Sequence, residues 1–227
     1  MQTSDQARAL AEALVRTSNG AGCKTAALVT DMNQPLAPAA GNALEVAVVM
    51  EALTEPKNSR LVDLTLALGA ELMVLAGMET AREVAAVKLR DGLQSGAAAE
   101  AFDAMIAALG GPKAFSADWQ RRLPEANVIR EIPAPSAGNL AAFNGHAIGM
   151  AVVRMGGGRM KQGDRIDPSV GFSDIVPLGT DLAKGQPLAR LHAASEKAAQ
   201  AAERAFLDAV TIGDEAEVPP LMHDRVA

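Results

Sequence analysis

The spacing of apolar residues divides the chain into two parts that meet near residue 123. In the first part apolar residues mostly recur every three or four positions, which is the period of one helix face. In the second part short apolar runs alternate with turns rich in Gly, Pro, Asn and Asp, a pattern typical of β-strands. The pattern therefore predicts two domains, residues 1–123 and residues 124–227.

The first domain is predicted to be mainly helical, with one short buried strand at Thr25–Thr30. Helices are expected at residues 4–20, 42–53, 59–76, 80–90, 97–109 and 112–122. The helix at 59–76 carries an apolar stripe formed by Leu61, Leu64, Leu68, Leu72 and Leu75. A helix followed by a strand is a unit of a parallel α/β sheet, so we expect helices around an incomplete, mostly parallel sheet. Because a lone strand cannot satisfy its own backbone groups, its neighbours should come from a missing segment or a partner.

The second domain is predicted to be a small antiparallel β domain of barrel-sandwich type. Strands are expected at residues 128–132, 138–143, 146–155, 170–176 and 187–192, and a helix at 193–210. Asn144-Gly145 lies between two of these runs and is a hairpin signal. The predicted fold class of the chain is therefore α/β plus α+β.

Composition excludes several classes of function. The formal net charge is −6 and no basic cluster is evident, which argues against binding to nucleic acid or to an anionic membrane. Cys23 is the only cysteine, so we expect no internal disulfide, no thiolate metal cluster and a cytoplasmic location. The first residues lack the apolar core of a secretory signal. The uncharged run Met32–Leu44 is interrupted by proline and glycine and is too short to span a membrane.

Few residues in the sequence point to chemistry by themselves. His146, His192 and His223 lie far apart, without the i+3 or i+4 partners that a metal site would need. No local signature of a Ser–His–Asp site is present. Met155–Arg159 contains three glycines and an arginine, which fits either an anion-binding nest or a turn that needs positive φ. We assign no catalytic residue on this basis.

Other charged residues have structural interpretations. Glu100 and Asp103 share a predicted helix, where such a pair is typical of a solvated face. Lys161 and Lys184 lie in predicted turns of the barrel-sandwich-like domain, but neither has the sequence context of a modified carrier lysine. A carrier function is therefore not expected.

Three blocks of sequence resemble one known family. They are Asp31–Val46 (DMNQPLAPAAGNALEV), Asn58–Leu68 (NSRLVDLTLAL) and Gly149–Arg159 (GMAVVRMGGGR) with Ile166–Phe172 (IDPSVGF). In this order they resemble the C-terminal portion of thymidine and pyrimidine nucleoside phosphorylases, and the similarity runs from Met1 to about His192. Members of this family cleave pyrimidine deoxynucleosides with phosphate, giving the base and 2-deoxyribose 1-phosphate. The resemblance implies a pentosyltransferase of nucleoside salvage.

The family's phosphate-binding and base-binding motifs are absent from the sequence. There is no Lys-His-Ser motif, no Thr-Gly-Gly loop and no Arg…Ser…Lys helix. In the family these motifs precede the point that matches Met1. We therefore expect the chain alone to be inactive and to act on nucleoside and phosphate only with the missing N-terminal half.

The resemblance also implies a metal site. Some members bind potassium through backbone carbonyls that correspond to Leu36 and Ala39, and through a Glu side chain nine residues further on. That position is Val48 here, with Glu45 one helical turn away. A hard cation prefers oxygen ligands, so the loss of a carboxylate weakens the site. Leu36 and Ala39 remain the candidate ligands, and phosphate is expected only as a co-substrate.

Two alternatives to a phosphorylase polypeptide stay open. One is a non-catalytic interaction module that retains the fold, with a sheet edge and the loop Asp31–Gly41 as its surface. The other is an enzyme of different chemistry, which would need a cluster of titratable residues. An uncovered strand edge also predicts self-association by sheet pairing.

Overall fold

Capping side chains define several of the helices that the sequence predicts. Thr3 Oγ1 accepts a hydrogen bond from the Gln6 amide at 3.3 Å and begins helix α1 (Ser4–Gly20). Ser59 Oγ accepts from the Val62 amide at 3.2 Å and begins α3 (Arg60–Leu75). Such bonds satisfy amides that have no partner inside the helix, so they favour these start points over their neighbours.

The computed structural model describes residues 3–227 and divides the chain into two units by its internal contacts. Unit 1 comprises the chain up to Asp31, Glu55–Ala98 and Pro219–Ala227, and unit 2 comprises Met32–Thr54 and Ala99–Val218. The division between residues 123 and 124 that the apolar spacing indicates stays a prediction.

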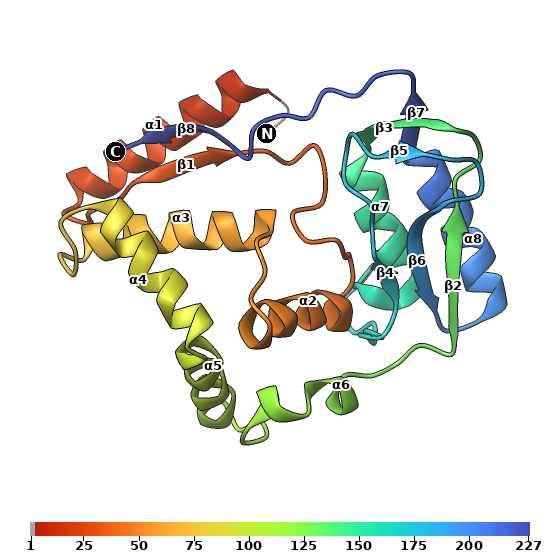
Figure 1. Cartoon of the computed structure of the whole chain (residues 1–227), viewed down its shortest axis with the longest axis horizontal. Helices are drawn as coiled ribbons and strands as arrows, with labels where there is room; N and C mark the ends of the chain where they lie inside the picture. Colours follow the sequence, from red (N-terminus) through yellow and green to blue (C-terminus); the bar gives the residue numbers. More distant parts are fainter. Residues whose placement is uncertain (1–2) are drawn as a thin grey trace. The chain divides into compact units, whose positions relative to one another are not determined.

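Unit 1 is built from three helices and two strands (Figure 1). In chain order they are α1, β1 (Ala27–Thr30), α3, α4 (Arg82–Gln94) and β8 (Met222–Val226). Helix α5 (Ala97–Ala108) begins at the end of this unit and continues into unit 2. The strand predicted at Thr25–Thr30 is thus confirmed over its last four residues.

The prediction of a mostly parallel sheet is wrong for the described chain. Strand β1 pairs with β8 in antiparallel register, with Ala27 opposite Val226 and Val29 opposite Asp224. The neighbour of β1 is the C-terminal tail, which the sequence pattern did not mark as a strand. All pairings between the strands of residues 3–227 are antiparallel, so the fold is a mixed α+β fold.

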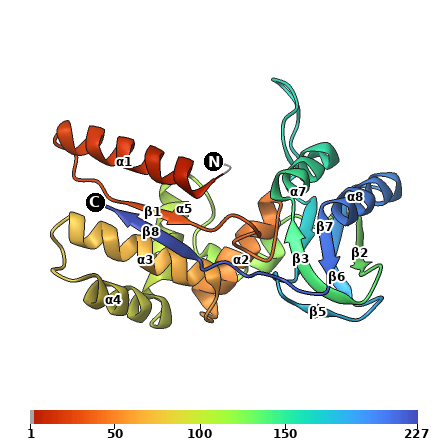
Figure 2. The same cartoon turned by 90° about the horizontal axis from the view of Figure 1, so that it is seen from above.

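Helices α1 and α3 lie on opposite sides of the two-stranded ribbon, as Figure 2 shows. Two consecutive residues of β8 explain this arrangement, since neighbouring side chains of a strand point to opposite faces. Asp224 pairs with Arg8 of α1 at 2.6 Å, and Arg225 pairs with Glu71 of α3 at 2.5 Å. The ribbon is therefore tied to one helix on each face.

The buried face of α3 is not the leucine stripe that dominates its sequence. Val62, Leu66 and Ala70 are buried, each no more than 5% exposed. At about 100° per residue, the stripe formed by Leu61, Leu64, Leu68, Leu72 and Leu75 points roughly the opposite way. Leu68 and Leu72 in this stripe are 49% and 67% exposed. The helix thus has two apolar faces, one buried and one partly exposed, chiefly at Leu68 and Leu72.

Unit 2 combines two three-stranded antiparallel sheets with helices. One sheet has the order β2–β6–β4 and the other β5–β3–β7. The strands are β2 (Val128–Pro133), β3 (Gly138–Phe143), β4 (Gly171–Ser173), β5 (Asp181–Leu182), β6 (Pro187–Ala193) and β7 (Val210–Gly213). The helices are α2 (Asn42–Thr54), the 3-10 turn η1 (Phe115–Ala117), α6 (Trp119–Arg122), α7 (Gly145–Val152) and α8 (Glu196–Asp208). The predicted small antiparallel β region is confirmed.

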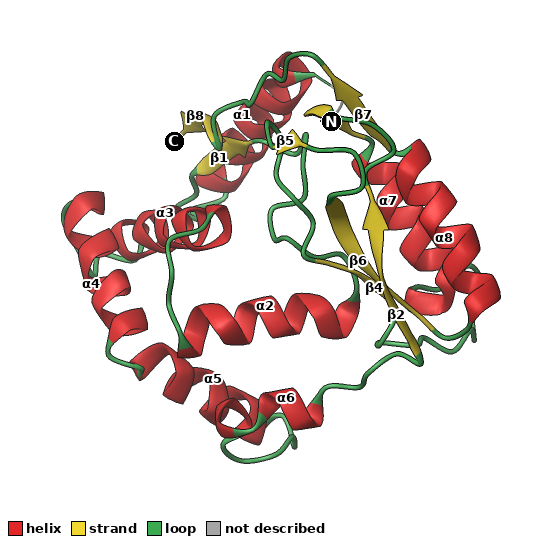
Figure 3. Ribbon diagram, turned by 45° about the vertical axis from the view of Figure 1, so that its right-hand side comes forward, coloured by secondary structure: helices red, strands yellow, loops and turns green. Residues whose placement is uncertain are grey.

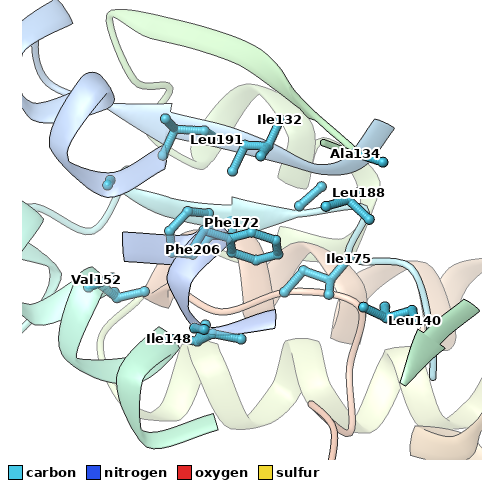
Figure 4. Packing of buried hydrophobic residues seen from close by; sticks show 14 of the residues in the cluster. Ile132, Ala134, Leu140, Ile148, Val152, Phe172, Ile175, Leu188, Leu191 and Phe206 are labelled. Carbon is cyan, nitrogen blue, oxygen red and sulfur yellow. The ribbon is translucent and has the colours of Figure 1, made fainter. Parts of the chain in front are cut away.

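A core of buried apolar side chains lies in unit 2, between the sheets and helices α7 and α8 (Figure 3). Phe172 of β4 and Phe206 of α8 are fully buried, with ring centroids 4.9 Å apart. Figure 4 shows Leu140, Ile148 and Leu191 around this pair. Burial of such side chains is the main favourable term in folding, worth about 1.5–3 kcal/mol for each large residue.

The strand and hairpin predicted around Asn144-Gly145 are wrong. Residues 145–152 form α7, and a π-helical turn, η2 (Val153–Gly157), follows directly. Asn144 Oδ1 accepts from the Ala147 amide at 3.0 Å, so this residue caps a helix instead of forming a turn between strands. Packing of the buried side chains Ile148, Ala151 and Val152 against the core overrides their β-leaning propensity.

Within residues 3–227, no helix combines the length and the apolar content that crossing a membrane requires.

Candidate functional site

The segment with the strongest family resemblance is held against β4 by a two-way backbone bridge. The amide of Ala40 donates to the Phe172 carbonyl at 2.8 Å, and the Phe172 amide donates to the Ala40 carbonyl at 2.8 Å. Gly41 follows Ala40 and Gly171 precedes Phe172, and the two backbone segments approach each other closely at these glycines. A Cβ on Gly41 would lie 2.5 Å from the Val170 carbonyl oxygen, and one on Gly171 would lie 2.2 Å from the Ala40 carbonyl oxygen. These positions therefore require glycine.

Four further bonds fix the same segment within unit 2. They join the loop before α2 and the first two residues of α2 to residues that follow α7. The bonds are Asn42 Nδ2 to the Gly157 carbonyl (2.8 Å), the Ala43 amide to the Pro168 carbonyl (2.9 Å), the Ile175 amide to the Pro38 carbonyl (3.0 Å) and the Leu178 amide to Gln34 Oε1 (3.1 Å). Gln34 is 4% exposed, so its bond to Leu178 satisfies a buried polar group. This loop is consequently well ordered by contacts inside the chain.

The candidate potassium ligands, the carbonyls of Leu36 and Ala39, lie in this loop, and the carboxylate of the family pattern is missing beside them. Leu36 is half-buried at a bend and Ala39 is 5% exposed. The half-buried Val48 on α2 offers no oxygen where the family pattern has a carboxylate. Glu45 Oε1 instead accepts from the Gly41 amide at 3.0 Å, at the beginning of α2. Among residues 3–227 no three His, Cys, Asp or Glu side chains gather into a metal site built from side chains.

Unit 1 has its own polar centre around Glu71. Arg225 donates from Nε and Nη2 to the two carboxylate oxygens at 2.5 and 2.9 Å, and Arg82 Nη1 donates to Oε1 at 3.2 Å. The hydrogen bond from Arg225 lowers the pKa of Glu71 despite the opposing effect of burial. The same bond raises the pKa of Arg225. Glu71 is therefore held as a carboxylate that accepts bonds from two guanidinium groups.

An open cavity of about 440 Å³ lies beside this centre. Its wall includes Glu71, Arg82 and Arg225, together with the apolar side chains of Leu28 and Ala67. The carboxylates of Glu83 and Asp224 also line it. Three carboxylates therefore face two arginines across the wall, so the cavity has no positive surplus that would attract an anion.

A second buried ion pair lies in unit 1 at the end of β1. Asp31 is 3% exposed, and Arg60 Nη2 donates to its Oδ2 at 2.7 Å. Asp31 is the first residue of the family-like segment, and its amide also donates to the Leu221 carbonyl at 2.9 Å. The ion pair ties the end of β1 to the beginning of α3, and the backbone bond holds it beside the tail that leads into β8.

Ser173 and His192 form a polar pair at the β4–β6 pairing. Ser173 Oγ lies 2.9 Å from His192 Nε2, and burial lowers the pKa of His192, with Arg190 adding to the effect. Ser173 Oγ also donates to Asp174 Oδ2 at 3.4 Å, and Arg190 Nη1 lies 3.5 Å from the same oxygen. The acid thus lies on the serine side of the pair, whereas a catalytic triad needs it on the far nitrogen of the histidine. We assign no catalytic role to this pair.

The remaining predicted positions are dispersed. His146 is exposed on α7, and His223 lines the cavity of unit 1. In the glycine-rich segment, Gly156 has φ 102° and its carbonyl accepts from the Asp167 amide at 2.9 Å, which supports the interpretation as a turn. Asp103 accepts from the Ser116 amide and hydroxyl at 2.8 and 2.6 Å and orders the turn at η1. Exposed turns hold Lys161 and Lys184.

Two family models and several known proteins match the chain. Residues 140–213 match the family model of the pyrimidine nucleoside phosphorylase C-terminal domain, and residues 1–99 match that of the glycosyl transferase family, a/b domain. Thymidine phosphorylases of Burkholderia cenocepacia (strain HI2424) and Burkholderia orbicola (strain MC0-3) are each 44% identical over the whole chain.

The chain belongs to the thymidine and pyrimidine nucleoside phosphorylase family. It corresponds to a C-terminal portion, and it spans 52% of the length of these relatives. The predicted family membership and the recognition of a partial sequence are therefore confirmed. The Ala40–Phe172 bridge joins two of the blocks that carry the resemblance, one before α2 and one at β4.

Sequence reasoning missed the polar centre at Glu71. Its two partners lie 11 and 154 residues away along the chain, in α4 and in β8. The one available signal was a Glu in an otherwise uncharged stretch, Leu64–Leu75. A buried carboxylate needs a cation, but sequence does not say which arginine supplies it.

Proposed function

We propose that this chain is the C-terminal part of an enzyme that cleaves pyrimidine deoxynucleosides with phosphate, releasing the base and 2-deoxyribose 1-phosphate. The support is its identity of 44% over 227 residues to proteins named thymidine phosphorylase. Phosphate attack at C1′ passes through an oxocarbenium-like state, so the enzyme must hold phosphate and stabilise charge on the departing base. The motifs for both tasks are absent from this sequence.

In this proposal the described chain supplies scaffold and not reacting groups. The loop from Asp31 to Gly41 is ordered by the contacts to β4 and to the residues after α7. A loop positioned in this way can support a binding site formed elsewhere. The proposed location is the cytoplasm, where a single exposed thiol such as that of Cys23 stays reduced.

The test is release of thymine from thymidine and phosphate. We expect none from the purified 227-residue chain. Turnover should begin when the part of the Burkholderia cenocepacia relative that the match leaves uncovered is added, with the complete relative as positive control. Thymine release by the chain alone would show that it carries a full active site.

The second candidate is a non-catalytic interaction module. One observation favours it: the two groups of unit 1 whose pKa values are shifted, Glu71 and Arg225, form an ion pair with each other. The DNA that precedes the Met1 codon discriminates between the two. An in-frame or adjacent reading frame with the Lys-His-Ser and Arg…Ser…Lys motifs supports the enzyme, and unrelated sequence supports the module.

A further inference from the structure

Two backbone anchors on β4 and the residue after its end hold the loop that precedes α2. Phe172 exchanges two hydrogen bonds with Ala40, and the Ile175 amide donates to the Pro38 carbonyl at 3.0 Å. The side chains of Phe172 and Ile175 both enter the core of unit 2, as Figure 4 shows. Residues 172–175 therefore form a clamp on this loop, with one anchor at each end.

The middle of the clamp is strained and polar. Asp174 has φ +51°, a left-handed conformation that few residues other than glycine adopt. Its Oδ2 lies 3.4 Å from Ser173 Oγ and 3.5 Å from Arg190 Nη1, and Ser173 Oγ lies 2.9 Å from His192 Nε2. A strained residue persists only where its surroundings hold it. Two side chains of β6 thus support the conformation that joins the two anchors.

The single hydrogen of the Ser173 hydroxyl can point to either neighbour, and the state of His192 decides which. A neutral ring with its hydrogen on Nδ1 accepts from Ser173 and leaves the Asp174 carboxylate to Arg190. A protonated ring carries a hydrogen on both nitrogens, so Nε2 must donate to Ser173 Oγ and the hydroxyl must turn toward Asp174. Protonation therefore redirects the bonds of the clamp and places a second cation beside Arg190.

Charged groups lie around His192 on each neighbouring strand. They are Arg190 on β6 itself, Asp174 after β4, Glu131 on β2 and Glu125 before β2. The acids of α8, Glu196 and Glu203, bind Arg130 on the opposite face of the sheet, because side chains alternate along a strand. Burial lowers the pKa of His192 and Arg190 adds to this, against the opposite effects of Asp174 and Glu125. These surroundings favour the neutral ring.

We propose that His192 makes the anchorage of the loop before α2 depend on pH, with the neutral ring keeping the clamp closed on Pro38 and Ala40. Protonation weakens the clamp, because His192 and Arg190 then compete for Asp174 in a half-buried site. Since the folded-state pKa of His192 is lowered, the unfolded chain binds this proton more readily. The anchorage is therefore complete above the ordinary pKa of 6.5 and is lost as pH falls from there through the folded value.

Hydrogen exchange of backbone amides measures the anchorage at pH 7.5 and at about pH 5, on either side of the histidine titration. Rates are divided by those of an unstructured chain, which removes the direct effect of pH on exchange. Protection of the Ala40 and Ile175 amides should fall by at least about threefold at the lower pH. The Leu140 amide, which donates to the Thr180 carbonyl elsewhere in unit 2, should keep its protection.

A variant that cannot be protonated isolates the ring. In His192→Gln the loss of protection at Ala40 between the two pH values should disappear. His146→Gln is the matched control, since His146 is exposed on α7, and it should retain the loss. Circular dichroism verifies that both variants fold. Equal protection of Ala40 at both pH values in the unmodified chain overturns the proposal, and so does a loss that survives in His192→Gln.

Titration of the His192 ring followed by NMR tests the bond chain without this variant. Asp174→Asn suits a positive φ and removes a carboxylate that favours the protonated ring, so it should lower the pKa of His192 further. Arg190→Gln removes the neighbouring cation and should raise that pKa. A His192 pKa at or above 6.5 in the unmodified chain, or one that responds to neither variant, would show that the ring does not sense the clamp.

Discussion

Arg225 in the last strand binds Glu71 in α3 through two hydrogen bonds across 154 residues of sequence. The neighbouring residue, Asp224, binds Arg8 of α1 on the other face of the ribbon at 2.6 Å. Strand β8 is thus held by side chains on both faces as well as by its backbone pairing with β1. The C-terminal tail is therefore an integral part of unit 1.

Replacing Arg225 by Ala should loosen this tail. The Glu71 side chain, 9% exposed, would keep only Arg82 as partner, and loss of a charge-assisted bond at a partly exposed site costs about 1–2 kcal/mol. Native-state hydrogen exchange at the amides of β8 measures the local opening. Arg16→Ala is the control, because Arg16 is exposed on α1 and forms no ion pair with the described residues. Equal exchange in both variants would contradict the prediction.

Glu71 should also make stability depend on pH in the acid range. Its folded-state pKa is lowered from 4.5, chiefly by the Arg225 hydrogen bond. A carboxyl with a lowered pKa stabilises the fold fully above its unfolded value, and this contribution is lost as pH falls through the folded value. The stability difference between the unmodified chain and Glu71→Gln should therefore shrink below pH 4.5.

Denaturant titrations at about pH 7 and at several acid values measure this difference. Glu12→Gln is the control, since Glu12 is exposed on α1. A difference between the unmodified chain and Glu71→Gln that stays constant into strong acid would show that the pairing does not survive in solution.

The bridge between Ala40 and Phe172 should not tolerate a side chain at Gly171. A Cβ there would lie 2.2 Å from the Ala40 carbonyl oxygen, and φ is +152°. Backbone strain and overpacking together predict a loss of about 2–5 kcal/mol for Gly171→Ala, measured as the free energy of unfolding. Gly149→Ala in α7 is the control, because nothing lies within 4 Å of its added Cβ, and alanine favours a helix. We expect that control to be neutral or slightly stabilising.

Potassium should not stabilise the chain more than sodium does. The carbonyls of Leu36 and Ala39 lack a nearby carboxylate, since Val48 is apolar and Glu45 accepts from the Gly41 amide. Thermal unfolding in equal concentrations of potassium and sodium chloride tests this. A higher melting temperature in potassium alone, abolished by Glu45→Gln, would show that Glu45 serves as the missing ligand.

Local signals predicted most helices, because their capping groups lie next to the residues that they serve. Thr3 and Ser59 are examples, each accepting from an amide three residues further on. The same local rules misassigned Asn144, whose side chain can form a turn or cap a helix equally well. Burial of Ile148 and Val152 in the core of unit 2 selected the helix.

The sequence by itself determined the family and the positions of most helices, since these depend on residue type and short-range spacing. Only the tertiary structure decided that β1 pairs with the C-terminal tail, that Arg225 is the partner of Glu71, and that α3 buries Val62 and Leu66 instead of its leucine stripe. The physical reason is that these contacts join segments distant in sequence. Their free energy depends on which surfaces meet after folding, and periodicity along one segment carries no information about its partner.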